Sequence, residues 1–208
     1  QNNPTPSRAL ETLYEFYTST ILNNYDNYLE DTVFCNDHSL AYPSSFELNN
    51  SNSGNFDSSV NGNPGDLRFG AFKRLTVDYQ PSLACPREED KYTVSETLGN
   101  GKLQYPVGLI TADELAFAGA KYYANGGNMY LKNSSSSGYR LWTMTPSRYG
   151  YNGDNEIALF SFYPSDTGSL GITDANDQEA IHPVVSLAPD VRISGGDGSA
   201  SNPYTVTK

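Results

Sequence analysis

The sequence is poor in the residues that build metal and redox centres. Its 208 residues include two cysteines, two histidines, two methionines and one tryptophan. A zinc centre needs about four ligands, mostly cysteine and histidine. Neither cysteine stands in a CxxC pair, and only His38 and His182 could add further ligands of that kind. Zinc binding and thiol catalysis are therefore not expected.

Long apolar runs are also missing. No stretch approaches the roughly 20 consecutive apolar residues that a transmembrane helix requires. No signal-peptide pattern opens the chain at Gln1. The sequence predicts that this segment does not insert into a membrane. A secreted protein stays compatible with it, because a signal peptide is removed from the mature chain.

Basic residues are outnumbered by acidic ones. The 24 Asp and Glu residues oppose 13 Lys and Arg residues, which gives a formal net charge of −11. This charge repels phosphate backbones and anionic lipid surfaces, so nucleic acid is not expected as a partner. The acidity fits either a solubilising surface or a calcium site, which needs several oxygen ligands.

The two cysteines that are present suggest a disulfide. Cys35 and Cys85 form an even count in a chain rich in Tyr, Asn and Gly, and this pattern favours a bridge over two buried thiols. Closing a loop of about 50 residues would stabilise the fold by about 4 kcal/mol in the chain-entropy model. The length and even composition predict a single domain over 1–208, with a helical segment at 1–30.

The start of the chain carries the pattern of an amphipathic helix. Thr5 is a suitable N-cap and Pro6 a suitable first helical residue. Apolar residues then recur at helical spacing: Leu10, Leu13, Tyr14, Tyr17, Ile21, Tyr25 and Tyr28. We expect one long helix, or two with a break near Asn23 and Asn24, with this tyrosine-rich stripe in the core.

The composition of the middle of the chain predicts mostly loop. Residues 36–66 are dominated by Asn, Ser, Gly and Pro and predict a long loop whose ends the disulfide would tie together. Residues 75–79, LTVDY, alternate in character and predict an edge strand or extended loop.

A clearer local signal lies at residues 105–119, YPVGLITADELAFAG. It predicts a short strand at 107–110, a capping box of Thr111 and Glu114, and a small helix that ends at Gly119. Carboxylates at the first turn complement the helix dipole, so the Asp113 and Glu114 pair is expected to be structural and not an acid/base pair.

The end of the chain predicts a sheet. The stretches LWTMT, IALFSFY and VVSLAPDVRI are each bounded by Gly, Asn, Asp or Pro. The tail predicts a turn built by Asp197, Ser199 and Asn202, followed by a last short strand. The fold class is therefore α+β: an N-terminal helix or helix pair, a loop-rich region and a mainly antiparallel C-terminal sheet.

Six motifs together resemble one group of proteins. The set is FCNDHS, YPVGLITADELAFAG, WTMTPS, GSLGI, HPVVSL and GDGSASNPY. It resembles surface-exposed, C-type-lectin-like domains of Gram-positive gut bacteria and mollicute relatives, and the wider formylglycine-generating-enzyme fold. The resemblance covers roughly residue 31 to the C-terminus and implies a lectin-like core over 31–208.

The chain departs from that group at two places. The group's VRPV motif has His182 in place of its arginine, so a buried arginine pair at that turn is not implied. Lectin-like folds usually begin with a strand paired to the last one, whereas this chain begins with a predicted helix.

The resemblance does not imply an enzyme here. Enzymes of this fold use paired active-site cysteines or a three-histidine iron site, and this chain has neither set. No GxSxG elbow is present, and His182, directly before Pro183, is expected to pack in the core and not to act as a base.

Calcium is the only cofactor that the sequence leaves open. The EPN, QPD and WND motifs of calcium-dependent lectins are absent. A different set of acidic residues near Asn176 could supply oxygen ligands at loop spacing, although solvated turns explain it equally. These weak metal candidates are Asp166, Asp174, Asp177 and Glu179.

The expected ligand-binding residues lie around the connection between the first two strands of the predicted sheet. Aromatic rings stack on sugars or peptides, and Asn and Asp side chains pair with hydroxyl groups. The candidates are Trp142, Tyr149, Tyr151, Asn152, Asp154 and Asn155. Among them, the tyrosines are expected to be exposed, and Trp142 also fits a core position.

The predicted function is non-catalytic recognition or display at the surface of a Gram-positive-type bacterium. The module would bind a host glycan or protein, as an adhesin does. The alternative is a structural subunit of a pilus or filament, a pilin-like protein that self-assembles and lacks its hydrophobic N-terminal helix. The amphipathic N-terminal helix and the Asn/Gly loops fit this alternative as well.

Overall fold

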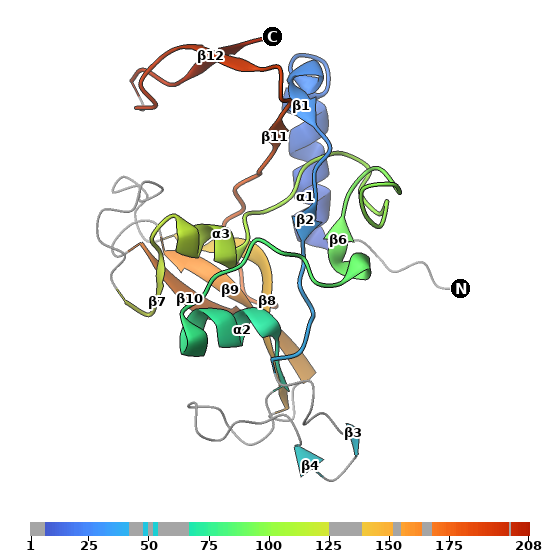
Figure 1. Cartoon of the computed structure of the whole chain (residues 1–208), viewed down its shortest axis with the longest axis vertical. Helices are drawn as coiled ribbons and strands as arrows, with labels where there is room; N and C mark the ends of the chain where they lie inside the picture. Colours follow the sequence, from blue (N-terminus) through green and yellow to red (C-terminus); the bar gives the residue numbers. More distant parts are fainter. Residues whose placement is uncertain are drawn as a thin grey trace.

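The structure is a computed structural model that describes residues 7–41, 48–49, 52–53, 67–124, 139–151, 155–163, 168–199 and 201–208. Most of the predicted loop at 36–66 lies outside these residues. The described chain is a mixed α+β fold built around one five-stranded sheet (Figure 1).

The sheet has the strand order β5-β8-β9-β10-β7. Its strands pair antiparallel except for β7, which runs parallel to β10. The strands are β5 (Leu67–Arg68), β7 (Lys121–Tyr122), β8 (Leu141–Tyr151), β9 (Asn155–Tyr163) and β10 (Ser169–Asp174). The first two predicted C-terminal strands are confirmed as β8 and β9, which pair antiparallel.

The third predicted strand is not continuous. Residues 184–193 do not continue the five-stranded sheet. They give an isolated bridge at Val184, the two-residue strand β11 (Ser186–Leu187), a turn at Pro189 and Asp190, and the start of β12 (Arg192–Gly195). Proline and aspartate break the apolar run, and β10 occupies the edge of β9 instead.

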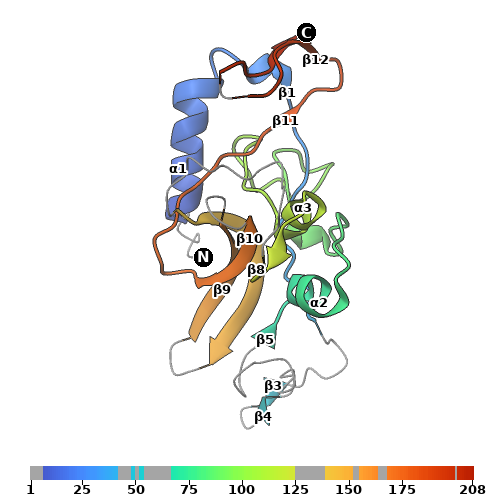
Figure 2. The same cartoon turned by 90° about the vertical axis from the view of Figure 1, so that its left-hand side faces the viewer.

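Helical segments cover one face of the sheet (Figure 2). They are α2 (Gly70–Lys73), the π-helical turn η4 (Arg74–Asp78) and α3 (Ala112–Phe117). Their apolar side chains form a buried cluster with the strands, which includes Phe72, Leu75, Leu115, Phe160 and Phe162. Residues 75–79 are therefore not a strand: Leu75 and Phe72 share the inner face of a helix, where residues three apart are neighbours.

The predicted start and end of α3 are confirmed. Thr111 Oγ1 accepts a hydrogen bond from Glu114 N, and a Glu114 carboxylate oxygen accepts one from Thr111 N at 2.7 Å. Gly119, just past the helix, has a φ of 104°. The preceding residues, 107–110, form only a single bridge, at Gly108, and not the expected strand.

The helix α1 (Arg8–Phe16) lies on the opposite side of the sheet from α2 and α3 (Figure 2). Its N-cap is Ser7, whose backbone is extended and whose hydroxyl accepts a hydrogen bond from Leu10 N. The predicted start at Thr5 and Pro6 is therefore wrong, because a cap at Ser7 places the first helical residue at Arg8.

The helix continues as a π-helical turn, η1 (Tyr17–Ile21), and breaks at residues 22–25, as expected, before η2 (Asp26–Tyr28). Leu13 and Tyr17 are buried against Val107 and Leu109. Tyr25 is 54% exposed, so the tyrosine stripe is core only along its first part.

Short ladders extend the molecule beyond the sheet (Figure 1). A turn η5 (Glu88–Asp90) precedes one of them. The ladders pair β1 (Leu29–Glu30) with β11, β2 (Phe34–Cys35) with β6 (Lys91–Tyr92), β3 (Leu48–Asn49) with β4 (Asn52–Ser53), and β12 (Arg192–Gly195) with β13 (Thr205–Thr207). The predicted last strand and its turn, with Ser199 N donating to Asp197 Oδ1, are confirmed.

The predicted disulfide is confirmed. Cys35 in β2 is bonded to Cys85, with a Cα–Cα distance of 5.7 Å. The bridge fixes the irregular segment before η5 against β2.

Candidate functional site

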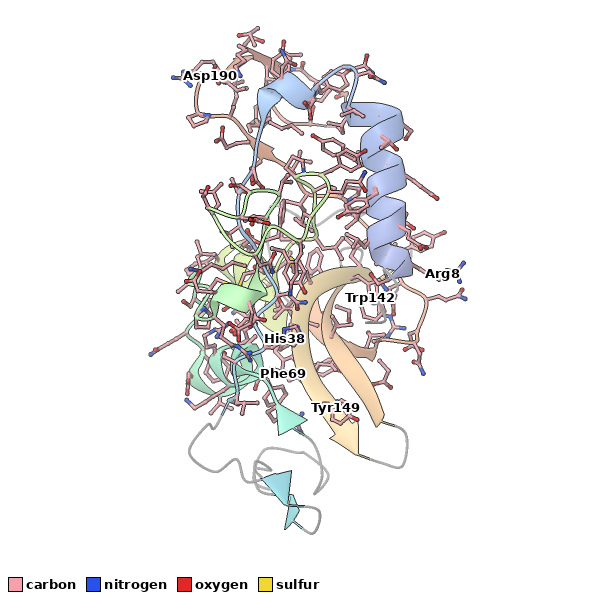
Figure 3. The ribbon with its side chains drawn as sticks, turned by 90° about the vertical axis from the view of Figure 1, so that its right-hand side faces the viewer. Arg8, His38, Phe69, Trp142, Tyr149 and Asp190 are labelled. Carbon is pink, nitrogen blue, oxygen red and sulfur yellow. A yellow bond between two sulfur atoms is a disulfide. The ribbon has the colours of Figure 1, made fainter. Side chains whose placement is uncertain are left out.

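A groove of about 840 Å³ lies between the N-terminal end of α1 and the sheet. Figure 3 shows Arg8 and Trp142 near each other where this end of the helix meets β8. The turn after β10 forms a further wall. The central lining residues are Arg8, Leu10, Trp142, Met144, Asp177 and Glu179.

The alternation of β8 places Trp142 in this groove. Leu141 is buried in the cluster beneath α2 and α3, whereas Trp142 and Met144 pack beside α1 and Leu13. Successive strand residues point to opposite faces of a sheet. Trp142 therefore borders the core cluster and is partly exposed in the groove.

The turn after β10, which carries Asp177 and Glu179, is held beside Trp142 by backbone hydrogen bonds. Trp142 N donates to Ala180 O, and Ala180 N donates to Arg140 O, both at 3.0 Å. Asp177 N donates to Asp174 O in the turn that precedes this pairing. The positions of Asp177 and Glu179 relative to the indole are thus set by the main chain.

Glu179 is a buried carboxylate. Its side chain is 4% exposed, and Arg140 Nε lies 2.6 Å from its Oε1, close enough for an ion pair although the direction of this contact does not make a hydrogen bond. Burial raises the pKa of Glu179, an effect that Arg140 opposes and Asp177 reinforces. The carboxylate is therefore only partly compensated.

A second polar atom among the groove residues also lacks a hydrogen-bond partner. Asn36 Oδ1 is buried and has no hydrogen-bond partner among the residues that the structure describes. Asn36 lines the same groove as Trp142. Buried polar atoms without partners are few in folded proteins. Ligand sites are typically apolar grooves that hold aromatic side chains and a few polar groups, and this groove has that composition.

A smaller cavity of about 210 Å³ lies beside the disulfide and has a different character. Arg74 Nη1 donates to Asp37 at 2.7 Å, while its Nε and Nη2 donate to the two oxygens of Asp113 at 3.1 and 2.9 Å. The remaining oxygen of Asp37 accepts from Ser39 N, and Asp113 also accepts from Ser82 N. All four carboxylate oxygens therefore have a donor.

This closed cluster corrects one prediction. Glu114 caps α3 as expected, but Asp113 turns to Arg74, which lies 39 residues earlier. Asp113 and Glu114 are therefore both structural: Glu114 caps a helix, and Asp113 forms an ion pair with Arg74.

The other predicted ligand residues that the structure describes lie further along the two strands than Trp142. Tyr149 lies seven residues further along β8, about 23 Å at the usual strand rise, and Figure 3 places it toward the far end of the hairpin. It is half-buried and paired with Leu67 and Ile157, not exposed in a loop. The described chain gives only the backbone of Tyr151 and Asn155, both within strands, and Asn152 and Asp154 lie outside it.

The described members of the predicted acidic set have different environments. Asp174 ends β10, Asp177 is exposed in the following turn, and Glu179 pairs with Arg140. Asp166 lies outside the described residues. Within the part of the chain that the structure describes, no group of three or more His, Cys, Asp or Glu side chains could hold a metal ion.

Sequence reasoning missed several groove residues. Arg8, Met144 and Asn36 carry no signal of their own, because the groove forms only when α1 packs against β8. His182, expected in the core, is exposed.

Comparisons with protein-family models, curated proteins and solved structures give no match to this chain. Across the described ranges, no helix has the length and apolar character needed to span a membrane.

Proposed function

We propose that this chain is a non-catalytic recognition module of a cell-surface or secreted protein, with a C-type-lectin-like core, and that it binds a glycan or a protein partner in the groove between α1 and β8. The observation that carries this proposal is the partly exposed Trp142 beside the buried, partly compensated Glu179. An aromatic ring and a carboxylate in one apolar groove are typical of sites that recognise a ligand.

Two features support recognition over catalysis. Both cysteines are bonded to each other, so neither supplies a reactive thiolate. His38 is held by Asp90, which accepts from His38 N at 2.8 Å and lies 3.1 Å from its Nδ1, and this pair stands outside the groove lining.

The disulfide also supports an extracellular location. Disulfides persist in secreted and surface proteins and are rare in the cytosol. The surface of a Gram-positive-type bacterium, expected from the motif resemblance, is the location that we propose.

The filament alternative fits the structure less well. In a pilin-like subunit, a hydrophobic helix would continue into α1. Here Ser7 has φ −67° and ψ 148°, an extended conformation that separates Arg8 from any helix before it. The cap therefore supports a helix that serves as a wall of the groove.

The test is a binding screen of the folded chain against an array of glycans and mucin-type proteins, with and without a calcium chelator. Trp142 is the only tryptophan, so its fluorescence reports occupancy of the groove. We expect at least one ligand to bind reproducibly and to change this fluorescence. Silence across the array from folded protein would overturn the proposal and move the assignment to a structural subunit.

A further inference from the structure

The segment of residues 79–87 is exposed and extended. It runs between η4 and η5 without a helix, strand, turn or bend, and its inner side lines the cavity beside the disulfide. Leu83 is 69% exposed, and Ala84 and Pro86 are exposed as well. An exposed leucine by itself needs no functional explanation. Leu83 differs because its backbone is anchored on both sides.

The nearest anchors lie within two residues of this leucine. On one side, Ser82 N donates to Asp113 Oδ1 at 2.8 Å, and Asp113 is held in turn by Arg74. On the other side, Cys85 is bonded to Cys35 in β2. The main chain around the leucine is therefore fixed to two separate parts of the fold.

Further contacts and two prolines extend this order along the segment. Gln80 N donates to the carbonyl oxygen of the η4 residue Arg74 at 2.9 Å, and Arg87 Nη1 donates to a backbone oxygen of β2's neighbouring loop, His38 O, at 3.0 Å. Proline fixes its own φ and keeps the residue before it extended. Pro81 and Pro86 therefore favour the extended form that the segment has.

The backbone of Leu83 is available to a partner. Among the residues that the structure describes, neither its N–H nor its C=O takes part in a hydrogen bond. An extended segment with such groups can add as a strand to the sheet edge of another protein. In this mode, main-chain hydrogen bonds supply affinity, and a pocket for the outward side chain supplies specificity.

We propose that residues 80–87 form a binding loop for a serine protease of chymotrypsin-like specificity, with the Leu83 side chain in the apolar pocket that selects the residue before the cleaved bond. Chymotrypsin has a hydrophobic slot at this position. A loop that is already fixed in an extended form loses little conformational entropy on binding. The loop lies outside the lining of the groove between α1 and β8, so this inference goes beyond the proposed function and does not depend on it.

The anchors favour inhibition over rapid cleavage. Hydrolysis of the bond between Leu83 and Ala84 adds the hydroxyl of a water molecule to the Leu83 carbonyl carbon and a proton to Ala84 N. Both new ends would stay in place, because Leu83 follows the anchored Ser82, and Ala84 precedes Cys85. The bridge from Cys85 to Cys35 would also keep the two fragments joined. The protease would therefore stay occupied.

The test measures how the chain affects the hydrolysis of chromogenic peptide substrates by chymotrypsin and by trypsin. The corresponding pocket of trypsin carries an aspartate and selects basic side chains. We expect competitive inhibition of chymotrypsin and none of trypsin. Leu83→Ala should weaken the inhibition of chymotrypsin more than tenfold, as loss of a central apolar anchor does. Leu83→Lys should transfer the inhibition to trypsin.

Two further variants separate the loop from general surface effects. Leu98 is also exposed, at 50%, but lies in a turn outside the segment, so Leu98→Ala should leave the inhibition constant unchanged. The paired change Cys35→Ser and Cys85→Ser removes one anchor. With folding checked by circular dichroism, this variant should be cut by chymotrypsin after Leu83 and should inhibit it less.

The intact mass of the chain after incubation with chymotrypsin decides between inhibitor and substrate. A chain that stays intact while the enzyme is inhibited supports the proposal. Rapid and complete cleavage after Leu83 with loss of inhibition would overturn it, and so would no inhibition or an equal loss in Leu83→Ala and Leu98→Ala. Ligand binding in the groove is measured separately, through the fluorescence of Trp142, so the proposed recognition function stands or fails on its own.

Discussion

Two arginine–carboxylate groups in this molecule are built in opposite ways. Arg74 directs three nitrogens to Asp37 and Asp113, and every oxygen of these carboxylates has a donor. Arg140 Nε lies 2.6 Å from Oε1 of the equally buried Glu179, at the wall of an apolar groove, but this contact lacks hydrogen-bond geometry. A buried polar network that is fully hydrogen-bonded rigidifies a fold, whereas a buried polar group without partners is costly. The comparison therefore separates a fully hydrogen-bonded cluster from the groove in which we propose that a ligand binds.

The sharpest way to break this comparison is to remove each arginine. Arg74→Met removes the cation that pairs with two buried carboxylates and should lower the free energy of unfolding by about 3–5 kcal/mol. Arg140→Met should lower it by less than half as much, because the Arg140 side chain is 36% exposed and its contact with Glu179 lacks hydrogen-bond geometry. Urea denaturation measures both losses. Equal losses of unfolding free energy would show that the Arg74 and Arg140 ion pairs contribute equally to stability.

Removing the disulfide tests whether it stabilises the same segment as the Arg74 cluster. Cys85 is three residues from Ser82, whose N–H donates to Asp113 at 2.8 Å. The paired change Cys35→Ser and Cys85→Ser should lower the free energy of unfolding by about 4 kcal/mol or less. In combination with Arg74→Met the losses should add less than fully, since both changes release the same segment. Full additivity in urea melts would contradict a shared structural unit.

The sequence predicted what is local and missed what joins distant segments. The capping box at Thr111 and Glu114, Gly119 and the strands β8 and β9 follow from neighbouring residues. The Arg74 cluster unites positions 37, 74 and 113, and no spacing rule connects them.

The errors have the same physical origin. Residues 75–79 alternate like a strand, but packing of Leu75 against the sheet selects a helical turn. Trp142 and Tyr149 are close in sequence and were expected in one site, yet an extended strand separates them. Asp177 and Glu179 were singled out as metal candidates, and it is the pairing of Ala180 with β8 that brings them to Trp142.

The two helix caps allow a comparison with smaller expected effects on stability. Ser7 caps the helix that forms the groove wall, and Thr111 caps the helix beside the closed cluster. Each change to alanine should cost about 1 kcal/mol. Only Ser7→Ala should weaken ligand binding, because fraying of the first turn displaces Arg8 and Leu10 from the groove. Thr111→Ala with an equal loss of affinity would contradict this assignment.

The smallest expected effect is a pH dependence carried by Glu179. Burial raises the pKa of this carboxyl in the folded state, with Arg140 opposing and Asp177 adding to the shift. The folded chain then holds a proton that the unfolded chain has released, in the range above the ordinary glutamate pKa of about 4.3. Stability contributed by Glu179 is therefore present below that value and is lost as the pH rises through the folded pKa. The difference in urea midpoint between the parent chain and Glu179→Gln should shift in favour of the variant as the pH increases across this range. A constant difference would show that the carboxylate is fully compensated in the folded chain, and Glu179 would then belong with the carboxylates of the Arg74 cluster.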